Sequence, residues 1–208
     1  MQKYFWSSED FDVFHTDGLE KRMNALQTLI QPKFHKLGRH FADRLSSHGI
    51  DEFFPHVAKH ARRTVNPPKD SWVAFAPAKR GYKALPHFQI GLWGTHLFII
   101  LAVIYENPDK KGIAERLDRN SKVLTSLPIT YIFSSDHTKP EVTRISEAGI
   151  VGLGKVFDRL QTVNRAEFLV GRHLLREEAI NMSEDEFMHF AEETFDHLLP
   201  VYDVIIGR

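Results

Sequence analysis

The residues best suited to chemistry in this chain are basic, and they lie in its middle. Between residues 53 and 105 there are seven lysines and arginines but a single acid, Asp70. Most of these cations form two clusters, "KHARR" at 59–63 and "KRGYK" at 79–83. Arginine offers a planar fork of N–H donors that matches phosphate or carboxylate, and lysine adds a compact positive charge. The two clusters therefore predict a site for an anionic ligand, provided that they converge in space.

The second cluster lies in a loop whose ends are restricted. Pro77 and Pro86 flank it, and Gly81 permits a turn that other residues adopt only with strain. Two histidines stand close to the clusters in sequence and complete the predicted set. The candidate anion-binding residues are His60, Arg62, Arg63, Lys79, Arg80, Lys83 and His87.

The first cluster is expected to be extended over residues 59–66. Thr64 and Val65 are β-branched, and the Asn-Pro-Pro sequence at 66–68 cannot continue a helix. An extended chain places His60 and Arg62 on one face and Lys59 and Arg63 on the opposite one.

The basic residues also admit two interpretations that involve no ligand. The first is a solvated sheet edge, where lysine and arginine prevent pairing with a strand from another molecule. The second is internal neutralisation, because residues 176–208 carry nine acids and only two arginines. Both are compatible with the balanced total of 27 Lys and Arg against 27 Asp and Glu.

A small phosphate- or carboxylate-bearing molecule is the ligand that we favour. Four aromatic residues, Trp72, Phe75, Tyr82 and Trp93, are interleaved with the cations, and aromatic side chains hold single-stranded nucleic acids by stacking. The sequence pI of about 7.2 and the lack of a recognisable nucleic-acid module disfavour a polynucleotide, which is left open.

An enzyme is the main alternative to a binding domain. A hydrolase or transferase for a phosphorylated substrate could use His87, His96 or the Asp136-His137 pair for proton transfer. This alternative requires that these groups line one pocket. No Walker A sequence or nucleophile elbow is present, so the catalytic residues stay unassigned. A third alternative, a structural interaction domain, requires a large exposed apolar patch.

Metal and cofactor chemistry find little support in the sequence. His56 and His60 have the spacing of two ligands on a helix, but the glutamate of H-E-x-x-H is absent. The glycines at 149, 152 and 154 do not follow a strand in the dinucleotide-binding pattern. We therefore predict no metal site and no cofactor.

The elements that position these residues change character along the chain. Short β-type segments occupy 72–76 and 87–93, and Gly94-Thr95 fits a two-residue type II′ hairpin turn into the strand that begins at His96. One face of this hairpin carries Phe88, Ile90 and Leu92 and belongs to the core. The opposite face, with Gln89, Trp93 and His96, lies under a second layer or forms the floor of a cleft.

Helical patterns surround these strands. Apolar residues recur at helical spacing before and after Pro32, and Ser183 to Glu186 has the form of a capping box that opens a helix; Pro200 is expected to kink or end that helix. Further strands are expected at 129–135 and 166–176. The fold class is α+β, with an antiparallel or mixed sheet and helices packed on it in a single compact domain, residues 1–208.

Composition suggests where the protein acts. The chain has no cysteine, which suits a reducing cytoplasm, and its longest polar-free segment, 97–105, is too short to span a bilayer. We expect a soluble cytoplasmic protein without membrane association. The oligomeric state and the strand order are left open.

Several long motifs resemble one known family over the whole chain. They are "EDFDVFHTDGLEKRM", "IQPKF", "VAKHARRTVNPPKDSWVAF", "KRGYKALPHFQIGLW", "SSDHTKP" and "LPVYD". They resemble the YktB-like family of uncharacterised proteins from Gram-positive bacteria. The resemblance implies a soluble α+β domain and no established activity, so it assigns no site residue.

Overall fold

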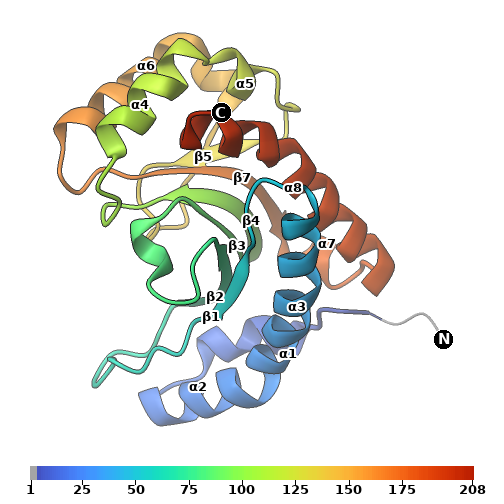
Figure 1. Ribbon diagram of the computed structural model, residues 1–208. Helices are drawn as coiled ribbons and strands as arrows, with labels where there is room; N and C mark the ends of the chain where they lie inside the picture. The colour runs from blue at the N-terminus through green and yellow to red at the C-terminus, as the bar shows by residue number, and fades with distance from the viewer. Residues whose placement is uncertain (1–3) are drawn as a thin grey trace.

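A seven-stranded antiparallel sheet organises the chain (Figure 1). The computed structural model describes residues 4–208. The strand order is β1-β2-β3-β4-β7-β5-β6. Strand β7, the last in the chain, therefore lies between β4 and β5, and β6 forms the far edge of the sheet. The strands are β1 Phe54–Val57, β2 Asp70–Ala76, β3 His87–Trp93, β4 His96–Val103, β5 Ile132–Ser134, β6 Thr143–Arg144 and β7 Phe168–Leu175.

Helices precede, interrupt and follow these strands, which confirms the α+β class and the single compact domain. The exact domain limits, 1 and 208, stay a prediction. The helices are α1 Ser8–Asp12, η1 Val13–His15, α2 Leu19–Ala25, η2 Leu26–Ile30, α3 Gln31–Ser47, η3 Tyr82–Ala84, α4 Lys110–Arg119, α5 Lys122–Thr125, α6 Ile145–Thr162, α7 Arg176–Ala179 and α8 Glu184–Ile206.

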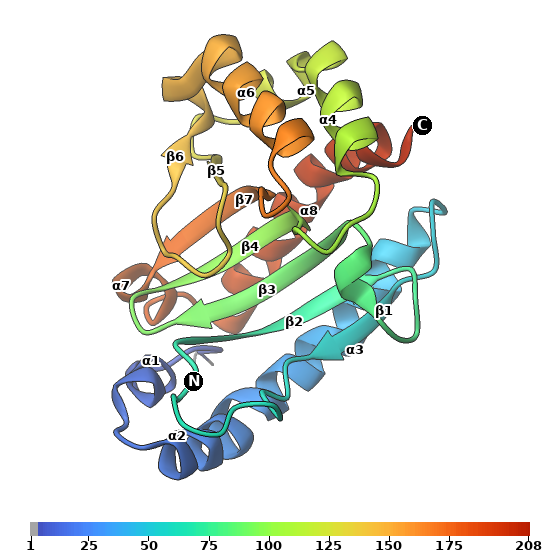
Figure 2. The same ribbon diagram turned by 90° about the vertical axis from the view of Figure 1, so that its left-hand side faces the viewer.

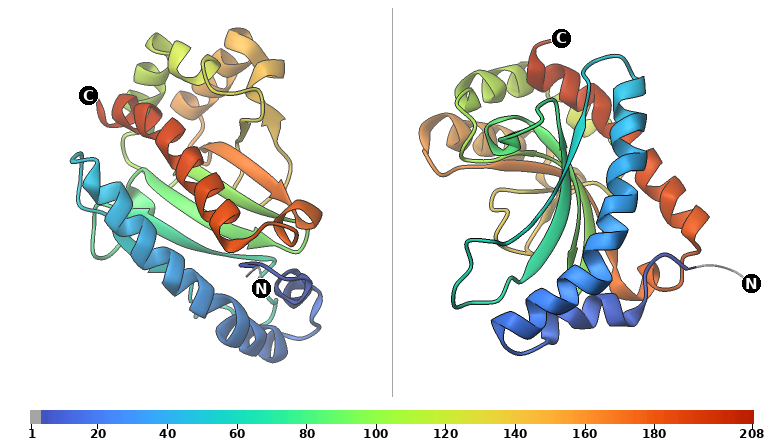
Figure 3. Two further views of the ribbon diagram at one scale, coloured as in Figure 1. Left: turned by 90° about the vertical axis from the view of Figure 1, so that its right-hand side faces the viewer. Right: turned by 60° about the horizontal axis from the view of Figure 1, so that its bottom comes forward.

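Two long helices cover one face of the sheet (Figure 3). Helix α3 packs on β1 and β2, and helix α8 packs on β4 and β7. The two helices run parallel and are joined along their outer sides by ion pairs, among them Lys36–Glu184 and Arg44–Asp196. Between these helices and the sheet lies the main core, where Phe41, Phe88 and Phe195 are fully buried.

Local sequence explains how α8 begins and how it passes its proline. The Ser183 hydroxyl accepts a hydrogen bond from the amide of Glu186, whose carboxylate in turn accepts one from the amide of Ser183. Pro200 lies inside the helix, which continues to Ile206. Of the two outcomes expected for Pro200, a kink or an end of the helix, the end does not occur. The residues that follow are held by burial of Val201, Tyr202 and Ile205.

The central hairpin has the predicted register. Leu92 of β3 faces Leu97 of β4, and Phe88 faces Leu101, so one face of the hairpin enters the main core. The predicted turn type is wrong, because Gly94 does not have the positive φ that a type II′ turn requires.

The second face of the sheet is open towards solvent over β2, β3 and β4 (Figure 2). It carries a small apolar cluster of Phe98, Ile100, Ala102, Ile104 and Leu169, with Trp72 and Trp93 packed against it. Helices α4, α5 and α6 lie at one end of this face rather than over it. Of the residues that alternate with the core residues of β3 and β4, a set of five lines a cavity on this face: Gln89, Trp93, His96, Phe98 and Ile100.

The extended conformation expected at 59–66 is wrong. The preceding strand, β1, ends at Val57, and residues 58–69 form a loop with a turn at 61–62. His60 has a φ of 50°, the left-handed conformation, which ends any strand at this point. Its imidazole Nε2 lies 3.2 Å from Ser71 Oγ, and this contact with β2 fixes the bend.

Among residues 4–208, no helix is long and apolar enough to cross a membrane.

Candidate functional site

A groove beside the edge strand β1 collects positive charge from several parts of the chain. We call it the basic groove. It has a volume of about 720 Å³ and lies between helix α3, strand β1, the loop after β1 and the loop before β3. Six cations line it: Arg39, Lys59, Arg62, Lys79, Arg80 and Lys83. The clusters "KHARR" and "KRGYK" therefore converge on one surface.

Most of these cations have no partner among residues 4–208. Lys83 lies 3.6 Å from Glu106, the one carboxylate that lines the groove, and the ammonium of Lys79 lies over the ring of Phe54. In the part of the chain that the structure describes, the remaining four cations make no ion pair, hydrogen bond or ring contact; they are Arg39, Lys59, Arg62 and Arg80. Four unpaired cations facing one hollow repel one another, and an anionic ligand would relieve that repulsion.

Four of the seven predicted site residues lie in the basic groove: Arg62, Lys79, Arg80 and Lys83. Arg39 and Lys59 also line it but were not predicted. Arg39 belongs to a helix that the sequence shows only as a core stripe, and its position in the groove depends on the packing of α3 against β1. No local signal identifies such a residue.

The remaining three predicted residues do not line the basic groove. Arg63 lines a hollow on the open face of the sheet, because the bend at His60 turns the chain between Arg62 and Arg63. His60 is half-buried against Trp72, and burial lowers its pKa to about 4. His87 is fully buried: its Nδ1–H donates to the carbonyl of Leu85, and burial lowers its pKa to about 4. Both imidazoles are neutral at pH 7.

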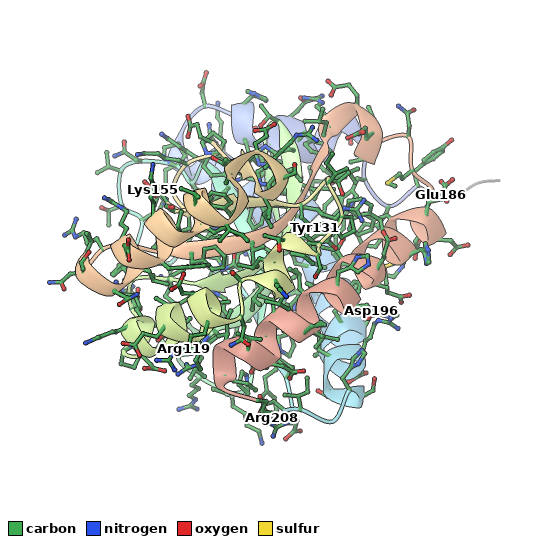
Figure 4. The ribbon with its side chains drawn as sticks, turned by 90° about the horizontal axis from the view of Figure 1, so that it is seen from above. Arg119, Tyr131, Lys155, Glu186, Asp196 and Arg208 are labelled. Atoms are coloured by element: carbon green, nitrogen blue, oxygen red, sulfur yellow. The ribbon has the colours of Figure 1, made fainter. Side chains whose placement is uncertain are left out.

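Internal neutralisation by the acidic C-terminal segment does not explain the groove. The acids of helix α8 pair with helix α3 and with strand β7, as in Arg44–Asp196 and Arg172–Glu193. Figure 4 shows the position of Asp196 on α8. Within residues 4–208, no ion pair joins a cation of the groove to this helix.

The open face of the sheet contains a second hollow, which we call the open-face cavity. It has a volume of about 40 Å³ and continues into a shallower hollow of about 550 Å³, with which it shares Asp70, Trp72, Trp93 and His137. Its apolar floor is formed by Phe98, Ile100, Ile132 and Leu169, and its further polar lining includes Gln89, His96, Asp136 and His173.

The enzyme alternative required that three histidine positions line one pocket. His96 and the Asp136-His137 pair line the open-face cavity, whereas His87 lies beneath it and accepts a hydrogen bond at Nε2 from the amide of Gln89, at 2.8 Å. The cavity therefore brings together two of the three predicted proton-transfer positions, without His87. It lies apart from the basic groove, since the two hollows share no lining residue.

One carboxylate–imidazole pair stands at the mouth of this cavity. The ring of His137 donates from Nδ1 to Glu167, at 2.7 Å, and the buried Glu167 carboxylate also accepts from the backbone amide of His137. This hydrogen bond raises the pKa of His137 above its usual value. Nearby, burial raises the pKa of Asp70 to about 6.

Comparison with known proteins places these features in a family context. Residues 6–202 match the family described as "Domain of unknown function (DUF1054)". A UPF0637 protein of Lysinibacillus sphaericus is 54% identical over 208 residues, covering 100% of this chain and 99% of that protein. UPF0637 proteins of Bacillus cytotoxicus and Bacillus velezensis are 50% and 48% identical, over 96% and 97% of each chain.

Proposed function

Since the chain belongs to the DUF1054 family, whose description assigns no activity, we propose a function from its own geometry: it binds a small anionic ligand in the basic groove. Membership over nearly the whole chain confirms the resemblance to uncharacterised proteins of Gram-positive bacteria that the motifs indicated. The ligand carries phosphate or carboxylate groups. The absence of cysteine favours action in a reducing cytoplasm.

The observation that carries this proposal is the convergence of unpaired cations. Arg39 comes from helix α3, Lys59 and Arg62 from the loop after β1, and Arg80 from the loop before β3. A solvated basic edge would need no such concentration from three segments around one hollow. The three guanidinium groups of Arg39, Arg62 and Arg80 have free N–H donors, and each can hold an anionic oxygen pair in the bidentate manner.

The size of the groove favours a molecule larger than an inorganic anion. Small-ligand sites commonly enclose roughly 300–1,000 Å³, and this groove of about 720 Å³ falls in that range. Tyr82 and His56 line it with rings 5.0 Å apart, so an apolar or aromatic part of the ligand would also find contacts. A phosphorylated metabolite fits this combination of charge and aromatic surface.

The enzyme and the interaction domain receive less support. An enzyme acting on an anion in this groove would need a proton-transfer group there. Two imidazoles line the groove: that of His56 donates through Nε2 to the carbonyl of Ala78, at 2.8 Å, and that of His35 is exposed on helix α3. An interaction domain would need one large apolar patch. Exposed large apolar side chains are distributed along the chain, from Leu29 on η2 to Leu175 at the end of β7; Ile150 and Val151 are neighbours on α6.

Titration with inorganic phosphate, sulfate and a nucleotide, followed by calorimetry and NMR, tests the proposal. We expect Arg80→Ala and Arg62→Ala each to weaken binding by roughly ten- to a hundredfold, as expected for loss of a charge-assisted hydrogen bond. Two matched controls each remove one positive charge elsewhere and should leave the affinity unchanged. They are Lys155→Ala, on helix α6 (Figure 4), and Arg63→Ala, outside the groove.

Equal affinity in all four variants would show that the charge of the groove does not select the ligand. Tight binding of a single-stranded oligonucleotide, with a steep fall as salt is added, would replace the small ligand by a polynucleotide.

A further inference from the structure

The open-face cavity contains a buried nitrogen without a hydrogen-bond partner. His96 is 5% exposed, and its Nδ1 lies 2.8 Å from the hydroxyl of Thr95. Its Nε2 is buried and has no partner within residues 4–208. An unpaired buried polar atom costs free energy, so native structures contain few of them. This nitrogen belongs to a ring that lines the cavity.

Flat rings surround this nitrogen. The ring of Trp93 is nearly parallel to that of His96, with 11° between the planes, and His96 stacks on His173 with ring centroids 4.1 Å apart. Trp72 also lines the cavity, and its indole N–H donates to the hydroxyl of Tyr82 at 2.9 Å. Because the indole N–H is already engaged, Trp72 presents its ring to the cavity as an aromatic surface.

The floor of the cavity depends on a glycine. Gly91 of β3 faces Phe98 of β4, and the ring of Phe98 lies where a side chain at 91 would project. Phe98 can therefore lie flat on the sheet beside Ile100 and Leu169. This leaves a hollow above an apolar floor, with a few polar groups at its walls, the usual composition of a small-molecule site.

Charge and size restrict the ligand. Burial keeps His96 and His173 neutral, with pKa values of about 4 and 3, so a charged group on this floor would lose its hydration without a counter-ion. The other titratable groups of the lining are Asp70, Asp136, His137 and Lys139. Lys139 pairs with Asp136 at 3.1 Å, and His137 pairs with Glu167. A volume of about 40 Å³ holds roughly three waters, or part of a single small ring.

We propose that the open-face cavity is a binding site for a small, flat, uncharged nitrogen heterocycle of the pyrimidine type. Its ring lies against the aromatic wall of Trp93, and one polar atom at its edge pairs with Nε2 of His96. A neutral imidazole offers either an N–H donor or a lone pair at Nε2, according to the tautomer, and both suit the edge of such a heterocycle. This site is separate from the basic groove.

The experiment uses the full chain with uracil as probe and benzene as a ring of similar size without a polar edge. Two-dimensional NMR follows the indole N–H signals of Trp72 and Trp93, with Trp6 of the main core as an internal reference. We expect saturable shifts at the first two signals and none at the third. In His96→Phe, which keeps the stacked ring but removes Nε2, uracil should bind at least tenfold more weakly, while benzene binds as well as before.

The matched control is His189→Phe, the same substitution on an exposed histidine of helix α8, which should leave uracil binding unchanged. If His96→Phe does not fold, Trp93→Ala replaces it, and this variant should weaken both probes. Binding of benzene but not uracil would overturn the proposal, as would equal uracil affinity in His96→Phe or shifts confined to residues outside the cavity.

Discussion

At Glu167 a single buried carboxylate organises the mouth of the open-face cavity. It accepts hydrogen bonds from the backbone amides of Tyr105 and His137 and from the ring of His137. It therefore joins the loop after β4, the loop after β5 and the start of β7. Such a multiply bonded carboxylate is a stable buried anion only while its donors remain.

Replacing Glu167 by glutamine tests this arrangement. The amide removes the negative charge, so the pKa of His137 should fall, because the ring loses its hydrogen-bonded carboxylate while burial still disfavours its charged form. Loss of the buried pair should also lower the free energy of unfolding by about 3 kcal/mol. NMR titration of the histidine ring signals measures the first effect, and urea denaturation measures the second.

The control for this substitution is Glu147→Gln, an exposed carboxylate on helix α6 that lies 3.7 Å from Arg144. It should change neither quantity. An unchanged His137 titration in Glu167→Gln would mean that the pair does not form in solution.

At the scale of elements, strand β3 shows how a glycine can shape a surface. A Cβ added at Gly91 would overlap the ring of Phe98, whereas one added at Gly154, in helix α6, meets nothing within 4 Å. The two glycines therefore have opposite roles. Gly91 allows the ring of Phe98 to pack directly on the backbone of β3, whereas Gly154 only lowers the helical propensity of its segment.

Substitution of each glycine by alanine should change stability in opposite directions. Gly91→Ala should lower the free energy of unfolding by about 1–3 kcal/mol through overpacking and push Phe98 into the cavity. Gly154→Ala should raise it by up to about 1 kcal/mol. Thermal and urea denaturation measure both. Recovery of stability in Gly91→Ala combined with Phe98→Ala would identify the ring as the cause, and a failure to recover would locate the strain elsewhere.

The elements were predictable where local pattern determines them. The alternation at 87–93 and the two-residue turn predicted the register of β3 and β4, and Ser183 marked the start of α8. The loop at 58–69 was not predictable, because His60 adopts its left-handed conformation in contact with β2. The same distinction holds for the cations of the basic groove. Residue type and clustering predicted four of them, whereas Arg39 lies in the groove because of tertiary packing, which the sequence does not show.

Across the whole molecule, buried neutral histidines link stability to pH. Burial lowers the pKa of His87 and His96 to about 4 and that of His173 to about 3. In the unfolded chain these rings bind protons near pH 6.5, so they favour the folded state fully above that pH. Their contribution is lost as the pH falls towards 4. Asp70 and His137, whose pKa values are raised, have the opposite sign: they favour the folded state more strongly at low pH.

We therefore expect a steep loss of stability in weak acid. Four histidines, His60, His87, His96 and His173, have pKa values lowered by burial. At about 1.4 kcal/mol per pH unit each, they give a slope of up to about 5.5 kcal/mol per unit between pH 6 and 4. Asp70, whose pKa is raised, reduces this slope by about 1.4 kcal/mol per unit. Urea denaturation at pH 7, 6 and 5 measures it. His173→Asn removes one of these titrating groups and should make the slope shallower by about 1.4 kcal/mol per pH unit. A free energy of unfolding that does not change between pH 7 and 5 would contradict the burial of these histidines in their neutral form.

The position of β7 in the sheet has a consequence for the order of folding. Strands β2, β3 and β4 are joined by short connections and can pair as soon as they are synthesised. The second neighbour of β4 is β7, which begins only at Phe168. Loop closure over so long a segment is slow, since its entropy is lost before the contacts form. During synthesis the apolar face of β4 therefore waits for β7 and α8, and we expect this interval to be the stage at which the nascent chain depends on chaperones.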